Sequence, residues 1–158
     1  ALMAVQTTEA AALIERYCAL LETGATPLPL PVTGSSMLPF LSPGRDSVLL
    51  ARVDRRLRRG DMALYRREGG GYVLHRIVAC QRDGGFAMAG DAQQLVERGI
   101  RRDQIVAVVC AAVRKGRRQE PGCFWWEFFA RVWPRVLPLR GGLCRAYRAL
   151  TRFRREQK

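Results

Sequence analysis

Residues 47–114 carry short apolar runs separated by glycine-rich turns, and this pattern limits the chain to a β-rich fold. Turn sequences such as Glu68-Gly69-Gly70-Gly71 and Asp83-Gly84-Gly85 favour tight reversals over helices. Residues 91–102 should form a loop or a short helical turn. The expected strands are 47–53, 62–67, 72–82, 86–89 and 105–114. We therefore expect a mainly β (α+β) fold built on a small coiled antiparallel sheet or barrel.

Helical segments should flank this region. Residues 8–23 fit an amphipathic helix, and the proline-rich stretch 27–31 after it must be extended. Its apolar stripe would consist of Leu13, Tyr17, Leu20 and Leu21. Beyond residue 116, two amphipathic helices are expected at 124–133 and 143–153, broken by Pro134 and Pro138. The chain then divides into an N-terminal helix (1–26), a β-rich domain (27–118) and a basic, aromatic-rich tail (119–158).

Positive charge is concentrated at the end of the chain. Residues 114–158 contain thirteen Lys/Arg and three Glu, which gives +10 of the total +13. Such a tail indicates an anionic partner, and Trp and Phe on its apolar side favour a membrane surface contacted through 123–155. In the alternative reading the aromatic side chains pack back on the domain and the arginines are solvated. No nucleic-acid motif accompanies the charge, so nucleic acid is not the expected partner.

The chain offers little for metal or cofactor chemistry. Its five cysteines are scattered without CxxC spacing and there is one histidine, so we expect no metal site and no cofactor. The start of the chain has acidic residues and no uninterrupted apolar run, which predicts no signal peptide or membrane anchor. The expected location is cytoplasmic, with peripheral attachment to a membrane through the tail.

Few residues can act as a general base. Arginine stays protonated at neutral pH, and the only lysines are Lys115 and Lys158. A serine hydroxyl needs a base to become a nucleophile, and histidine suits that role near neutral pH. His75, the only histidine, lies within an expected strand that would hold its ring in one orientation. Strand alternation should send Arg76 to the opposite face.

Several motifs in order resemble the type I signal peptidase and LexA-like serine peptidase superfamily. They are Val32-Thr33-Gly34-Ser35-Ser36-Met37-Leu38-Pro39, Gly44-Arg45-Asp46-Ser47-Val48-Leu49-Leu50, Leu57-Arg58-Arg59-Gly60-Asp61-Met62-Ala63-Leu64-Tyr65, Tyr72-Val73-Leu74-His75-Arg76-Ile77-Val78 and Phe86-Ala87-Met88-Ala89-Gly90-Asp91-Ala92-Gln93. The likeness covers roughly residues 32–114. Because histidine stands where the common bacterial branch has lysine, the chain is similar to the histidine-base branch of the endoplasmic reticulum and archaea.

The resemblance implies a role for each matching residue. Ser36 would be the nucleophile, His75 the general base, and Asp91 a carboxylate that supports the site and orients the imidazole. The backbone N–H of Ser36 would stabilise the oxyanion, with Ser35 and Gly34 in support, and Met37 and Pro39 would contact substrate. Asp61 is expected to close a turn, and Asp103 is a weaker candidate for a second carboxylate.

Three departures from the family pattern matter. Gly34 carries no hydroxyl to complete the oxyanion hole, Gln93 replaces an asparagine, and the N-terminal transmembrane anchor of signal peptidases is not seen. We therefore expect a serine endopeptidase that trims a leader or signal-like peptide through an acyl-enzyme. The alternatives are a non-catalytic peptide- or membrane-binding module on the same fold and, less favoured, a LexA-like self-cleaving regulator, which would use lysine as its base.

Overall fold

The computed structural model describes residues 8–24, 27–139 and 141–147, and the strands among them form one antiparallel sheet. The strands are β1 (Leu28–Pro31), β2 (Ser47–Ala51), β3 (Met62–Arg66), β4 (Tyr72–Cys80), β5 (Phe86–Ala89), β6 (Glu97–Ile100), β7 (Ile105–Arg114) and β8 (Arg117–Gln119). The helical elements are α1 (Thr8–Glu22), η1 (Arg102–Gln104), α2 (Phe124–Glu127), η2 (Phe128–Val132) and η3 (Trp133–Leu139), followed by a helical turn at 141–147. This is the mainly β architecture expected from the sequence.

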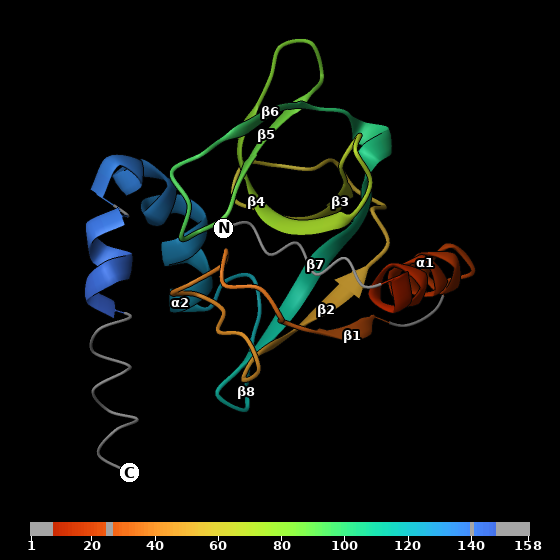
Figure 1. The fold of residues 1–158 in the computed structure, drawn as a ribbon, viewed down its shortest axis with the longest axis horizontal. Helices are drawn as coiled ribbons and strands as arrows, with labels where there is room; N and C mark the ends of the chain where they lie inside the picture. The colour runs from red at the N-terminus through yellow and green to blue at the C-terminus, as the bar shows by residue number, and fades with distance from the viewer. Residues whose placement is uncertain (1–7, 25–26, 140, 148–158) are drawn as a thin grey trace.

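The strand order is β1-β2-β7-β3-β4-β5-β6, with β8 paired to the end of β7. The long strand β7 crosses the middle of the sheet, and β5 and β6 lie far from β1 and β2 (Figure 1). Helix α1 lies beside β1 and β2, whereas α2 and the segments after it cover the other side of the molecule. Register shifts in the β2–β7, β3–β7 and β4–β5 pairs bend the strands, and bulges of this kind increase the local twist of a sheet.

The expected strands agree with the observed ones to within two residues at their ends, but three strands were not expected. β1 forms in the proline-rich stretch, where Val32 N–H donates to the Asp46 carbonyl of the neighbouring chain segment. Because N–H groups alternate sides along a strand, Pro29 and Pro31 then face the free edge of the sheet, where proline is tolerated. β6 lies in the stretch expected to be a loop, and β8 follows a turn at Lys115 and Gly116.

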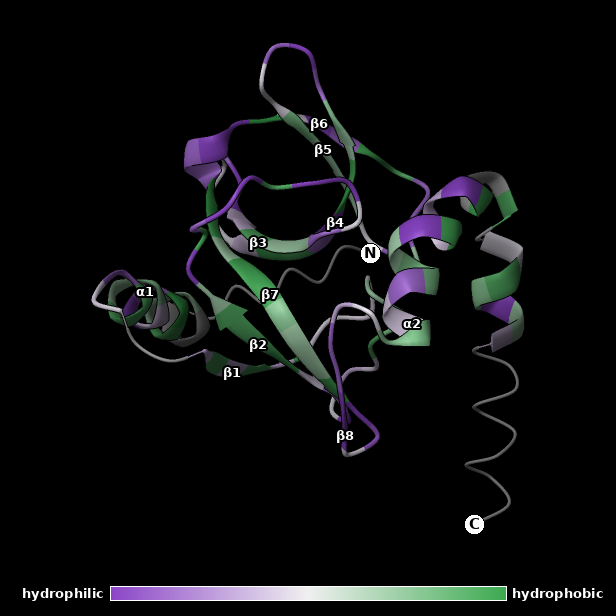
Figure 2. Ribbon diagram, turned by 180° about the vertical axis from the view of Figure 1, so that it is seen from behind, coloured by the Kyte–Doolittle hydropathy of each residue, from purple (hydrophilic) through white to green (hydrophobic). Residues whose placement is uncertain are grey.

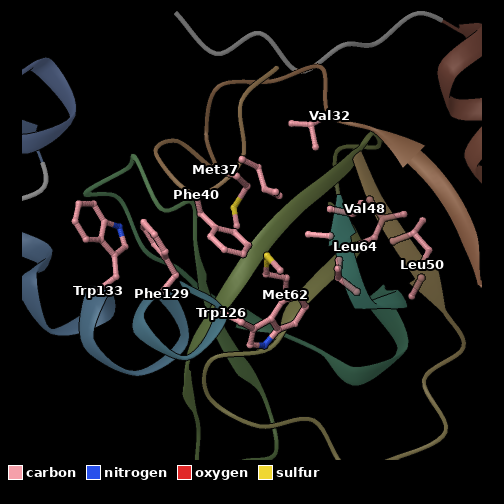
Figure 3. Packing of buried hydrophobic residues seen from close by; sticks show 14 of the residues in the cluster. Val32, Met37, Phe40, Val48, Leu50, Met62, Leu64, Trp126, Phe129 and Trp133 are labelled. Atoms are coloured by element: carbon pink, nitrogen blue, oxygen red, sulfur yellow. The ribbon is translucent and has the colours of Figure 1, made fainter. Parts of the chain in front are cut away.

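Two apolar clusters fill the two faces of β4. One cluster includes Tyr65, Ile77 and Met88. The larger cluster lies between the sheet, the loop after β1 and the helical tail (Figure 3); its labelled members are Val32, Met37, Phe40, Val48, Leu50, Met62, Leu64, Trp126, Phe129 and Trp133. Successive side chains of a strand point to opposite faces, which is why adjacent residues of β4 belong to different clusters.

The structure corrects the apolar stripe expected on the first helix. Leu13 and Leu20 are exposed, whereas Leu21 is buried and Ile14 packs against the larger cluster. Cys80, at the end of β4, is exposed. The cysteines are all free thiols.

The tail continues in helical turns past Pro134, and the break expected from Pro134 and Pro138 lies between them, at Val136. The backbone changes from α-helix to a wider π turn and then to a tighter 3₁₀ turn with a kink at Val136. These changes adapt the hydrogen-bond pattern to a proline that cannot donate. The expected helix 143–153 is described only as far as residue 147, and the remainder lies outside the described residues. Of the two readings of the tail, packing on the domain holds for Trp126, Phe129 and Trp133, which are buried.

A buried ion pair links β4 to the segment that follows β5. Arg76 of β4 donates through Nε and Nη2 to the two carboxylate oxygens of Asp91, at 2.9 and 2.8 Å, and both residues are about 1 % exposed. Its third nitrogen, Nη1, donates to the Gly60 carbonyl at 2.9 Å. The guanidinium also lies over the Phe40 ring, 5.3 Å from its centroid. Three hydrogen bonds and a ring thus take the place of water around this charge.

Removing one partner of this pair should be costly. We expect Asp91→Asn to lower the free energy of unfolding by about 3 kcal/mol or more, because the Arg76 cation stays buried without its counter-charge. Urea denaturation measures the change. Asp103→Asn is the matched control, since the Asp103 side chain is 70 % exposed, and it should change stability by less than about 0.5 kcal/mol. Equal effects of the two substitutions would contradict this role of Asp91.

Candidate functional site

Ser36 lies in the loop 32–46 between β1 and β2, and this loop is held in place by its own side chains. Met37, Phe40 and Leu41 are buried in the larger core cluster. The carboxylate of Asp46 accepts a hydrogen bond from the Ser42 N–H within the loop and from the Lys115 N–H beyond β7. Apolar anchors and a buried acceptor thus fix a loop that has little regular secondary structure.

The segment after β5 supports the serine directly. The Ser36 carbonyl accepts the Ala92 N–H at 2.8 Å. A Cβ atom added to Gly90 would lie 2.6 Å from the Ser36 carbonyl oxygen and 3.0 Å from its Cβ, so glycine is required for this approach. The segment after β5 thus contacts Ser36 through its backbone, which differs from the side-chain role expected of Asp91.

The chemical groups of Ser36 remain available. The side chain is half-buried, and none of the described residues forms a hydrogen bond with its hydroxyl or its backbone N–H. Ser35 is exposed and Gly34 half-buried, and a Cβ on Gly34 would meet open space. A serine with a fixed backbone, a free hydroxyl and a free N–H can serve both as a nucleophile and as an oxyanion donor.

His75 is buried on the other face of β4 from Arg76, as strand alternation predicts. Its Nδ1 lies 3.2 Å from the Tyr65 hydroxyl and 3.8 Å from the Glu97 carboxylate. Glu97 is also paired with Arg67. Burial lowers the pKa of His75 to about 4, with the Glu97 carboxylate opposing this shift and the Arg67 cation adding to it. The imidazole is therefore neutral at pH 7, as a general base must be.

The structure changes which carboxylate accompanies the imidazole. Asp91 does not orient His75, because both of its oxygens accept from Arg76 on the opposite face of the strand. The carboxylate beside His75 is Glu97, which the family-like motifs do not contain. Its position in β6 could not be read from the sequence, because that strand lies in a stretch expected to be a loop. Asp103 is exposed beside Arg101, and Asp61 closes its turn by accepting the Arg58 N–H, as expected.

Ser36 and His75 are not joined by a hydrogen bond in this structure. The serine loop buries Met37 and Phe40 in the cluster on the Arg76 side of β4, whereas His75 faces Tyr65. Met37 is 1 % exposed, so it is a core residue rather than a substrate contact, which corrects the expectation for it. Pro39 is half-buried and lines a surface cleft, where a ligand can reach it.

No metal site is found among the described residues, which contain no group of three metal-ligating side chains. Within the same residues, no helix is long and apolar enough to cross a membrane. A scan against protein-family models and a search of curated proteins both find no match to the chain. The geometry of the chain therefore carries the functional argument by itself.

The single histidine makes its titration directly measurable. We expect the NMR resonance of the His75 ring to titrate with a pKa near 4, far below 6.5. Glu97→Gln should lower that pKa further, because it removes a negative charge beside the ring and leaves the Arg67 cation. Glu68→Gln is the control, since Glu68 is exposed and pairs with Arg101. A pKa close to 6.5 would contradict the buried, neutral imidazole.

The lowered pKa of His75 also makes the free energy of unfolding depend on pH. Between pH 6.5 and 4 the unfolded chain binds a proton at His75 that the folded chain does not, so stability falls as pH falls through this window. The loss attributable to His75 is about 3 kcal/mol at most, from 1.36 kcal/mol per pKa unit. It should be missing from His75→Gln when the unfolding free energies of the two proteins are compared across this range.

Proposed function

We propose that the chain is a serine endopeptidase resembling signal peptidases, which cuts a leader or signal-like peptide with Ser36 as nucleophile and His75 as general base. The observation that carries the proposal is the state of Ser36. Its carbonyl is bound to Ala92 and its Cβ packs on Gly90, yet its hydroxyl and N–H are unused by the described residues. A serine with only a structural role would normally direct its hydroxyl to a neighbouring acceptor.

Tyr65 and Glu97 would orient the base. For Nε2 of His75 to accept a proton, Nδ1 must carry the hydrogen, and the Tyr65 hydroxyl oxygen at 3.2 Å is its nearest acceptor. Burial and the Glu97 carboxylate raise the pKa of Tyr65, which keeps the phenol protonated and able to donate in turn. The arrangement resembles a triad with a tyrosine inserted between histidine and carboxylate.

The reaction would proceed by acyl transfer. Ser36 Oγ attacks the scissile carbonyl while its proton passes to His75 Nε2, and the oxyanion accepts the Ser36 N–H. The protonated imidazole then gives its proton to the leaving amine as the C–N bond breaks. Water, deprotonated by His75, attacks the ester and releases Ser36. This sequence needs Oγ and Nε2 within hydrogen-bond distance, so substrate binding would have to bring the serine loop and the His75 ring together.

The backbone before the nucleophile offers a place for the substrate. Thr33 and Gly34 form no backbone hydrogen bond with any residue the structure describes, although Val32 before them is paired with Asp46. An extended peptide can pair with such a segment as an added strand. Its scissile bond would then lie next to Ser36.

A serine-directed probe tests the nucleophile without knowledge of the substrate. We expect a fluorophosphonate to label Ser36 in the folded protein, with the site located by mass spectrometry. His75→Gln should reduce the labelling rate by a factor of about 10² or more, because the base is lost. Ser35→Ala is the matched control and should be labelled like the wild type. Labelling spread over several serines, or none at Ser36, would favour the non-catalytic binding module.

The contact between Gly90 and Ser36 gives a second test. Gly90→Ala should displace Ser36 by several tenths of an ångström and lower cleavage of a leader peptide by a factor of about 10². The control is Gly69→Ala, because Gly69 has open space for a Cβ atom and no positive φ. Similar cleavage rates for these two folded variants would remove Gly90 from the catalytic arrangement.

A further inference from the structure

A cleft of about 740 Å³ lies between the β7–β8 turn, the serine loop and the helical tail. The helical segments that form one wall lie together on one side of the sheet, with apolar and polar residues interleaved (Figure 2). Its volume falls in the range of small-molecule sites. The lining residues are Pro39, Arg114, Lys115, Arg117, Gln119, Trp125, Phe128, Phe129, Trp133 and Tyr147. Ser36 and His75 are not among them.

One wall of the cleft carries three cationic side chains, Arg114, Lys115 and Arg117. Among the described residues, no carboxylate lies within 4.0 Å of Arg114, Lys115 or Arg117. The nearby acidic groups already have partners. Asp46 is paired with Arg45, Glu120 with Arg118 and Glu127 with Arg131. Three cations on a concave wall, none in an ion pair with a described residue, favour an anionic ligand.

Arg114 is the most constrained of these cations. Its Nε donates to the Phe40 carbonyl, and its guanidinium lies 4.7 Å from the Phe40 ring centroid and 5.9 Å from that of Trp125. The side chain is half-buried, and burial lowers the pKa of its guanidinium. None of the described residues accepts a hydrogen bond from its terminal nitrogens. A phosphate can accept from both at once.

The rest of the cleft lining is mainly aromatic, and exposed apolar side chains lie near it. Trp125 is 50 % exposed and the adjacent Phe124 is 72 % exposed, which is unusual for such large rings. Exposed aliphatic side chains continue along the tail at Val132, Leu139 and Leu143. Bases of a single-stranded nucleic acid would stack on the rings but gain little from these aliphatic groups. A hydrocarbon chain gains from both.

We propose that this cleft binds an anionic phospholipid at a membrane surface, with the phosphate at Arg114, Lys115 and Arg117 and acyl chains against the tail aromatics. Indole rings suit the depth of the headgroup boundary, where one end of the ring meets hydrocarbon and the other meets water. This site does not depend on the proposed peptidase activity, because it uses neither Ser36 nor His75. It would attach the domain peripherally through side chains, without a spanning helix.

Vesicle binding and tryptophan quenching test the proposal with the full chain. The three tryptophans, Trp125, Trp126 and Trp133, all lie in the helical tail, and two of them line the cleft. We expect the protein to sediment with phosphatidylcholine vesicles only when phosphatidylglycerol is included, and to be released at high salt. Phospholipids with brominated acyl chains should quench its tryptophan fluorescence in the same mixture.

Matched variants separate the cleft from the general basicity of the chain. Lys115→Asn/Arg117→Gln should weaken binding by on the order of tenfold. Asparagine is chosen because Lys115 has a φ of 49°, which asparagine tolerates. Arg82→Gln/Arg98→Gln removes the same charge from exposed positions in the β4–β5 turn and β6, and should bind like the wild type. Phe124→Ser/Trp125→Ser should lose binding while keeping the fold.

Several results would overturn the proposal. They are equal loss of binding in both charge variants, unchanged binding in the cleft variants, or vesicle binding without quenching by brominated chains. A single-stranded oligonucleotide or a leader peptide that shields the tryptophans, when vesicles do not, would assign the cleft to that ligand instead. Repeating the measurement in Ser36→Ala keeps these outcomes separate from any failure of the peptidase proposal.

Discussion

The ion pair between Arg76 and Asp91 is the interaction on which the other parts of the molecule converge. Arg76 comes from β4, Asp91 from the segment after β5, and the Gly60 carbonyl that Arg76 also contacts precedes β3. The Asp91 carbonyl accepts the Trp133 indole N–H at 2.7 Å, so the tail is attached to the same point. A charge buried in this way is tolerated only while every partner stays in place, which makes the surrounding geometry specific.

The position of Ser36 follows from that constraint. Asp91 holds its chain segment in place, and its sequence neighbours Gly90 and Ala92 contact the backbone of Ser36. Phe40 of the serine loop packs under the Arg76 guanidinium and against Phe129 of the tail. Adjacent residues of one strand thus have separate tasks. Arg76 positions the serine loop, while His75 stays neutral on the other face beside Tyr65 and Glu97.

The helical tail contributes both to the core and to an exposed surface. Its buried rings complete the core over the sheet. Ala130 packs closely on Gly60, and a Cβ atom added to Gly60 would lie 3.0 Å from the Cβ atom of Ala130. Its outer rings and the cations of the β7–β8 turn are left facing a cleft, and within residues 8–24, 27–139 and 141–147 these cations form no ion pair. An amphipathic helix whose apolar stripe is wider than the core can cover presents the remainder to another partner.

The sequence by itself determined the β-rich fold, most strand positions and the candidates Ser36 and His75. Alternating apolar residues, glycine-rich turns and the small number of possible general bases can all be read directly from the chain. Only the tertiary structure decided that Asp91 pairs with Arg76, that Glu97 accompanies His75, and that Met37 belongs to the core. β6 was missed for a different reason: Glu97-Arg98-Gly99-Ile100 lacks the alternating β-branched pattern of a strand, although it pairs with the preceding strand β5. Which carboxylate meets which cation depends on how strands far apart in sequence are brought together, and local pattern does not encode that.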